Sequence, residues 1–389
     1  MKRLRNTISL SLAFLCLPFT AGCTRLMNPR ELEQLQLVQT VGYDGAPGSV
    51  TISVSSGQGL NGEPPSLLAA NGGSITGAMR KLQDWSAREQ LYFAHVRYAV
   101  AGEDAARAGV EPLLDHFERG TQTPLNLPLL VVKGGTAREL VTGSTDPMYE
   151  VTALLASLQR DTQQMGTAYC FTVLDVAQRL ARSRAALCCA VTAEPAGENV
   201  PSAEEGALVA MEAGYAVLKE GKLVGYLDRD TALGADLVMN LAGEALYILT
   251  DGHGGTVTVE LRDGVTSLAP EWDAGRGLTV AVKLDYKAGI VDASGDLPMD
   301  EEFLARLDDT LALAMTRQVE AALRDSRDMN ADFMELYRQL AKKAPGAFPG
   351  TVPEDFLPAL RWRVEARATV ERSYDIDGSA NGEEESRHG

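Results

Sequence analysis

The stretch Leu127-Pro128-Leu129-Leu130-Val131-Val132 is a continuous apolar run that ends at the pair Gly134-Gly135. A run of this length without polar alternation is typical of a central strand that is buried on both faces. A helix pattern follows at Thr136–Val141. Because buried strands of this kind are covered by helices, the stretch favours a sheet with packed helices, in an α/β or α+β fold.

The rest of the first half continues this alternation of strands and helices. Val50, Ile52 and Val54 alternate with polar residues, which is the pattern of a half-buried strand. We expect further strands at 38–45, 91–100 and 188–193, and helices at 74–85, 103–118, 149–158 and 167–181, the first of them capped by Ser74. Residues 58–73 are rich in Gly, Pro and Asn and predict an exposed loop.

The second half begins after a polar segment rich in Pro, Gly and Ser at 194–205. A hairpin is expected around Lys219–Lys222, and strands at 245–250, 255–262, 265–268 and 278–288. The longest helix pattern spans Met299–Arg324, with apolar residues at three- and four-residue steps. A helix at 332–342 and a strand at 361–372 complete the pattern.

These segments predict a multidomain α/β (α+β) protein with mixed sheets, packed helices and three domains. The expected division is a signal peptide at 1–22, an N-terminal α/β domain at 23–198, a middle β-rich domain at 207–288, a C-terminal helix-plus-sheet domain at 289–373 and a disordered acidic tail at 374–389.

The N-terminus has the pattern of a lipoprotein signal peptide. A basic segment, Lys2 to Arg5, precedes an apolar run from Ile8 to Phe19, which is too short to span a bilayer. Thr20-Ala21-Gly22-Cys23 then resembles a bacterial lipobox, in which the Cys23 thiol receives a diacylglyceryl group. An ordinary secretory signal with an incidental cysteine is the alternative interpretation.

The composition excludes several function classes. The 389 residues carry 36 Lys and Arg against 53 Asp and Glu, a formal charge of −17. A chain this acidic repels phosphate backbones, so we expect no nucleic-acid partner. It also repels bare anionic lipid, so membrane attachment needs a specific device such as the lipid on Cys23.

No arrangement of residues predicts catalysis, a cofactor or a metal ion. His95 is expected inside a strand and partly buried, His116 near a helix end as a favourable cation, His253 in a turn and His388 in the tail. The carboxylate pairs Asp228/Asp230 and Asp308/Asp309 are expected by chance in so acidic a chain. Cys170, Cys188 and Cys189 are too few for a disulfide framework, although a bridge from Cys170 is left open.

Four segments, in this order, resemble motifs of the C-subunit lipoproteins of bacterial spore germinant receptors, the Ger(x)C family. They are Glu31-Leu32 through Gly42-Tyr43-Asp44, Leu91–His95 with Gly102-Glu103 and Gly109-Val110, the hairpin Ala213–Leu227, and Asp328–Arg372 with Trp362. Ala94 departs from the pattern, in which a glycine commonly precedes the histidine.

The resemblance implies a non-enzymatic three-domain lipoprotein on the outer face of the spore inner membrane. It implies action with a multi-span A-type subunit and a permease-like B-type subunit in a nutrient-sensing receptor. A solute-binding lipoprotein of a transporter is the alternative, and it would require two similar lobes. A secreted hydrolase would require a cleft of convergent ionisable groups that the sequence does not assemble.

Overall fold

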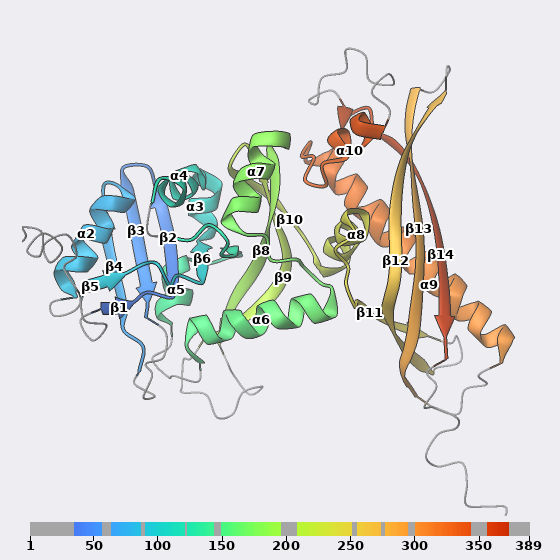
Figure 1. The fold of residues 1–389 in the computed structure, drawn as a ribbon, viewed down its shortest axis with the longest axis horizontal. Helices are drawn as coiled ribbons and strands as arrows, with labels where there is room; N and C mark the ends of the chain where they lie inside the picture. Colours follow the sequence, from blue (N-terminus) through green and yellow to red (C-terminus); the bar gives the residue numbers. More distant parts are fainter. Residues whose placement is uncertain are drawn as a thin grey trace, which may run out of the picture.

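The computed structural model describes residues 35–56, 64–86, 90–120, 123–143, 149–195, 208–250, 255–273, 277–294, 300–343 and 356–372. The expected signal peptide, Cys23 and the acidic tail lie outside these ranges. Within them, no helix is both long and apolar enough to cross a membrane. The expected α/β (α+β) class is confirmed, with helices packed on two mixed sheets (Figure 1).

A mixed eight-stranded sheet in the order β10-β9-β8-β7-β6-β2-β3-β4 forms the first half of the molecule (Figure 1). Its four central strands are parallel and antiparallel strands extend it at both edges. Every residue of β6 and β7 is buried, which confirms the central strand expected from the apolar run. The strands are β2 (Thr40–Ala46), β3 (Ser49–Ser55), β4 (Leu67–Gly72), β6 (Tyr98–Ala101), β7 (Leu129–Val132), β8 (Ala185–Pro195), β9 (Leu208–Lys219) and β10 (Lys222–Leu227).

Helices of this half pack on the sheet or on one another, and a short parallel pair, β1 (Leu35–Leu37) and β5 (Gln90–Tyr92), lies beside it. Ser74 caps the first helix as expected, since its Oγ accepts a hydrogen bond from the Gly77 N–H at 3.1 Å. The helices are α2 (Ile75–Trp85), α3 (Glu103–Ala108), α4 (Glu111–Arg119), α5 (Ala137–Thr142), α6 (Val151–Met165) and α7 (Val173–Ser183).

Four expected elements of this half are wrong in extent. The helix at 103–118 is two helices, because Gly109 takes a φ of +134° that a right-handed helix does not contain. The strand at 91–100 is interrupted by a turn at Ala94-His95, and the loop at 58–73 contains strand β4. The helix expected from 167 begins only at Val173, where Thr172 forms a capping box.

The hairpin of β9 and β10 continues the first sheet instead of beginning a separate one. β9 pairs with β8 from Pro195↔Leu208 to Ala185↔Lys219, so main-chain hydrogen bonds cross the expected boundary between 198 and 207. A buried strand such as β8 has a neighbouring strand on each side. The apolar pattern of β8 does not predict which strands these are. The three-domain division at those boundaries stays a prediction.

A four-stranded sheet in the order β11-β12-β13-β14 forms the second half. The strands expected at 255–262 and 265–268 form one long strand, because a register shift between Leu261 and Asp263 absorbs the polar break. β14 pairs in parallel with β13, and α9 and α10 supply the crossover. The elements are β11 (Leu246–Thr250), β12 (Thr256–Asp273), β13 (Gly277–Ala293), α9 (Glu301–Asp328), α10 (Leu336–Lys343) and β14 (Arg361–Glu371).

Helix α8 (Arg229–Met239) lies between the two sheets and packs on both (Figure 1). Its residues from Thr231 to Val238 are all buried, so the helix has no solvent-exposed face along these turns. It crosses the long helix α9 at Gly234, where an added Cβ would lie 2.0 Å from the main-chain oxygen of Gln318. The close crossing therefore depends on the absence of a side chain at Gly234.

We expect Gly234→Ala to lower the free energy of unfolding by about 1–3 kcal/mol, because overpacking at the crossing outweighs the roughly 1 kcal/mol gained in helix propensity. Urea unfolding followed by circular dichroism measures the change. Gly77→Ala is the matched control, since Gly77 is also helical and an added Cβ would meet only the Ser74 hydroxyl, at 3.3 Å. Equal stability of the two variants would contradict the close-crossing argument.

Candidate functional site

Residues of the Gly42-Tyr43-Asp44 motif tie strand ends to helix α5. The Asp44 carboxylate accepts hydrogen bonds from the main-chain N–H groups of Ala137 and Arg138, each at 2.8 Å. Burial raises the pKa of Asp44 and the two hydrogen bonds oppose that shift. Gly102, from the second motif segment (Leu91–His95 with Gly102-Glu103), packs against this carboxylate. An added Cβ at Gly102 would lie 2.0 Å from the Asp44 Oδ1.

The acidic residue of the second motif has a similar structural role. Glu103 accepts from the Gly134 N–H at 2.5 Å and from the Arg107 guanidinium at 2.6 Å. It thereby joins the start of α3 to the turn after β7. Near the C-terminus, Trp362 lies beneath the Arg327 guanidinium, 4.9 Å from the ring centroid, and so joins β14 to α9. These residues hold elements together and present no reactive atom to a cavity.

The two described histidines differ in how they meet the sequence expectation. His95 lies on an exposed turn and not inside a strand, 5.8 Å from the Tyr92 ring centroid, because the chain leaves the strand conformation between β5 and β6. His116 lies in the last turn of α4 as expected, and burial lowers the pKa of its imidazole, which disfavours the charged form. His253 and His388 lie outside the described residues. Among the described residues, no group of three or more His, Cys, Asp or Glu could hold a metal ion.

The carboxylate pairs act as acceptors for main-chain and side-chain groups. Asp228 caps α8 by accepting from the Thr231 N–H at 2.8 Å, and Asp230 lies 3.4 Å from the Gln318 amide. Asp308 accepts from the Val370 N–H at 2.6 Å, which joins α9 to β14. Asp230 lines a cavity between α8, β11 and α9 together with Tyr247 and Arg317.

The three described cysteines are free, buried thiols. Cys188 and Cys189 lie in the interior of β8, as the apolar run predicts, and burial raises the pKa of Cys188. The Cys170 sulfur lies 3.8 Å from the Thr162 hydroxyl, and no disulfide bond joins it to Cys188 or Cys189. The bridge left open by the sequence is therefore not formed in this structure.

A buried polar pair joins the two halves of the molecule. The Tyr215 hydroxyl on β9 donates to the Asp236 Oδ1 on α8 at 2.6 Å, and accepts from the Tyr169 N–H at 2.5 Å. The Asp236 Oδ2 has no hydrogen-bond partner, and burial raises the pKa of this carboxyl group to about 8. Burial therefore favours the protonated, neutral form of Asp236 near pH 7. The sequence reasoning did not single it out, although it is a charged residue within an otherwise small and apolar helical stretch.

A second tie runs from α7 to the segment after α9. The Arg179 guanidinium lies 4.4 Å from the Phe171 ring centroid and donates to the Phe333 main-chain oxygen at 3.1 Å. A desolvated cation over an aromatic ring is worth up to about 2 kcal/mol. The junction of the two halves is thus held by Tyr215, Asp236 and Arg179 together with the α8–α9 crossing.

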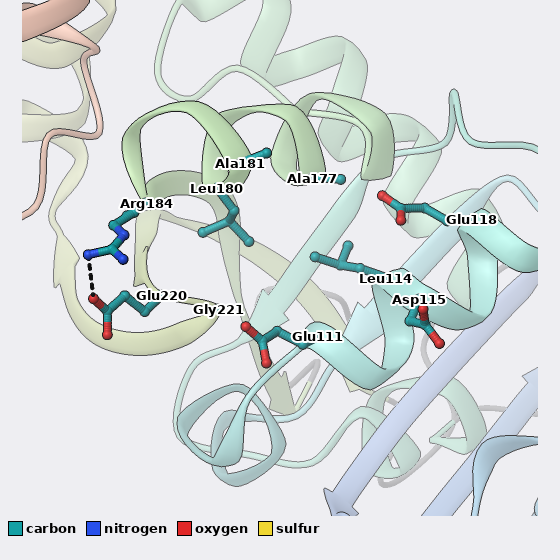
Figure 2. Close-up of a pocket in the computed structure, with 10 residues that line it drawn as sticks. All are labelled: Glu111, Leu114, Asp115, Glu118, Ala177, Leu180, Ala181, Arg184, Glu220 and Gly221. Atoms are coloured by element: carbon teal, nitrogen blue, oxygen red, sulfur yellow. Dashed lines mark ion pairs between the residues drawn. The ribbon is translucent and has the colours of Figure 1, made fainter.

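A cavity of about 530 Å³ opens beside this junction, between α4, α7 and the β9–β10 turn (Figure 2). Leu114 and Leu180 point toward each other across it, and an ion pair of 3.7 Å between Arg184 and Glu220 closes one end (Figure 2). Three further acids, Glu111, Asp115 and Glu118, line the α4 side. None of the lining residues is a histidine, cysteine, serine or threonine, so the candidate bases and nucleophiles of this cavity are carboxylates.

Comparisons with known proteins agree with the sequence motifs. Residues 28–192 match the family model described as spore germination protein N-terminal domain, and residues 213–374 match that described as spore germination B3/GerAC like, C-terminal. Spore germination protein KC of Bacillus subtilis (strain 168) is 25% identical over 385 residues, covering 90% of this chain and 92% of that protein. The crystal structure of the GerBC protein shares the fold, with a TM-score of 0.56 and 15% identity over 85% of this chain and 96% of that one.

The raised pKa of Asp236 gives the protein a defined pH dependence. Its unfolded-state pKa is about 3.9, so the folded state keeps a proton that the unfolded state releases above that pH. The contribution of the protonated Asp236 to the free energy of unfolding is fully present below about pH 4. It is lost as the pH rises through about 8, the pKa of Asp236 in the folded state.

We expect Asp236→Asn, which keeps an acceptor for Tyr215 and does not titrate, to abolish this loss. Relative to the unsubstituted protein, its free energy of unfolding should rise between pH 5 and pH 8 by at least about 1.4 kcal/mol, the equivalent of one pKa unit. Urea unfolding at each pH measures the difference. The exposed acid Asp309 supplies the control, Asp309→Asn. Parallel pH profiles for the Asp236→Asn variant and the unsubstituted protein would show that Asp236 is charged in the folded state.

Proposed function

The chain belongs to the Ger(x)C family of spore germination proteins, and from this membership we propose that it is the non-enzymatic, lipid-anchored subunit of a nutrient germinant receptor. Two family models cover most of its length in the order expected for that family. This ordered match is the observation that carries the proposal.

The proposed anchor is a diacylglyceryl group on Cys23, on the outer face of the spore inner membrane. Cleavage before Cys23 removes Lys2, Arg3 and Arg5 and no acid, so the charge of the mature chain becomes −20. Such a chain gains nothing from anionic headgroups, and acyl chains must supply the attachment. More than one chain is needed for stable anchoring, which a diacylglyceryl group provides.

The proposed partners are the membrane-embedded A-type and B-type receptor subunits. A lipid-anchored chain held at the same membrane meets them at a high effective concentration, so a modest interface suffices for assembly. The alternative, a solute-binding lipoprotein of a transporter, requires two similar lobes. An eight-stranded and a four-stranded sheet with different strand orders do not form such a pair.

We expect Cys23→Ala to move the protein from the membrane fraction to the soluble fraction and to reduce nutrient-triggered germination, because the acyl chains are lost. Immunoblots of fractionated spores and loss of refractility after nutrient addition measure the two effects. Cys16→Ala is the matched control, since Cys16 lies within the apolar run of the signal. Normal anchoring of the Cys23→Ala protein would contradict the proposed lipid anchor on Cys23.

A second experiment tests the receptor assignment. We expect A-type and B-type subunits to co-purify with a C-terminally tagged chain from detergent-solubilised membranes of dormant spores, as identified by mass spectrometry. An untagged strain gives the background. Recovery of an importer permease in place of those subunits would overturn the assignment in favour of the transporter alternative.

A further inference from the structure

A second cavity, of about 590 Å³, lies directly between the two halves of the molecule. One wall is formed by the end of α7, the start of β8 and the β9–β10 turn. The other wall is formed by the segment after α9 and by α10, which lies beside α7 at the top of the view (Figure 1). Arg184 and Glu220 line both this cavity and the 530 Å³ cavity between α4, α7 and the β9–β10 turn. Their ion pair therefore lies between the two cavities.

The charge of this cleft is opposite to that of the protein. In a chain of −17, five cations line it against two acids, namely Arg182, Arg184, Lys219, Arg338 and Lys342 against Glu220 and Asp332. The Asp332 carboxylate is already hydrogen-bonded to the main chain. Its two oxygens accept from the N–H groups of Leu336 at 2.7 Å and Tyr337 at 3.0 Å. The field inside the cleft therefore favours an anion.

Two of the cations are not used by the fold. Arg184 pairs with Glu220, Arg338 bonds Glu335 at 3.1 Å, and Arg182 bonds Gln178 at 3.0 Å. Lys219 and Lys342 make no ion pair or side-chain hydrogen bond within the described part of the chain. Lys219 is half-buried at the end of β9 and Lys342 lies in the last turn of α10, so the two free ammonium groups belong to opposite walls. An anion bound in the cleft would supply a charged partner for these two groups.

The rest of the lining is mainly apolar, with Ser183 and Asn330 as its uncharged polar side chains beside Tyr337. Ala331, Ala341 and Leu357 contribute small aliphatic surfaces, and the Tyr337 ring is fixed by an edge contact with Phe356, with ring centroids 5.6 Å apart. A cavity of a few hundred Å³ with apolar walls and a few charged groups is typical of small-molecule sites. An extended polyanion does not match this enclosure or the overall charge of the chain.

We propose that this cleft binds a small organic anion, with a carboxylate or phosphate group between Lys219 and Lys342 and a short apolar body against Tyr337 and Leu357. The ligand would contact both halves of the molecule at once. The inference goes beyond the receptor assignment and does not depend on the lipid anchor or on partner subunits.

Calorimetric titration of the detergent-purified full chain with benzoate and with benzamide tests the proposal, because the two probes share a shape and differ in charge. We expect saturable binding of benzoate, at least about tenfold tighter than that of benzamide. Lys219→Gln together with Lys342→Gln should weaken benzoate binding by about tenfold or more. Lys287→Gln is the matched control, since Lys287 pairs with Glu371 on the second sheet.

Three results would overturn the proposal. They are the absence of saturable binding by both benzoate and inorganic phosphate at millimolar concentration, equal affinity for benzamide, and unchanged benzoate affinity in the double variant. Complete displacement of benzoate by phosphatidylglycerol vesicles would also overturn it, by assigning the cleft to a lipid headgroup. An unchanged urea midpoint shows that the double variant is folded. If it is not, Lys342→Gln alone, at an exposed position, replaces it in the test.

Discussion

The arrangement of the two halves depends on burying helix α8 on all sides. A helix without a solvent-exposed face must fit its neighbours closely, and here the fit requires a missing side chain at Gly234 and an uncharged carboxyl group at Asp236. The Tyr215–Asp236 hydrogen bond then fixes α8 on the first sheet, while the crossing with α9 fixes it on the second. An ionised carboxylate at this position would face a desolvation cost that one hydrogen bond does not repay.

This constraint explains why the junction, and not a sheet face, collects the cavities of interest. Helices cover the centre of the first sheet, where β6 and β7 are buried throughout. Space remains where elements of different halves meet, namely at the end of α7, the β9–β10 turn and α10. Since Arg179 already bridges this boundary through Phe171 and Phe333, the cleft has walls held at a defined separation.

Local patterns in the sequence predict elements that are decided by burial. The apolar run at 127–132 gives β7, the stripe through Phe303, Leu307 and Leu311 gives the buried face of α9, and the alternation around Trp362 gives β14. Strand partners are not local, so the pairing of β9 with β8 could not be read from the hairpin alone. The split of α3 from α4 depends on the conformation of Gly109, and the raised pKa of Asp236 depends on residues far away in sequence. The cations of the cleft come from three segments that are far apart in sequence. No local motif therefore predicts that they line one cavity.

A ligand in the proposed cleft contacts elements of both halves of the molecule at once, so its affinity depends on how the two halves are arranged. Binding therefore shifts any equilibrium between such arrangements toward the one that binds the ligand more tightly. Its effect on that equilibrium is limited by this difference in affinity. Occupancy at a hundred times the dissociation constant is worth about 2.7 kcal/mol, which is comparable to the contribution of a single buried tie. A ligand of modest affinity therefore has enough free energy to shift such an equilibrium at the junction.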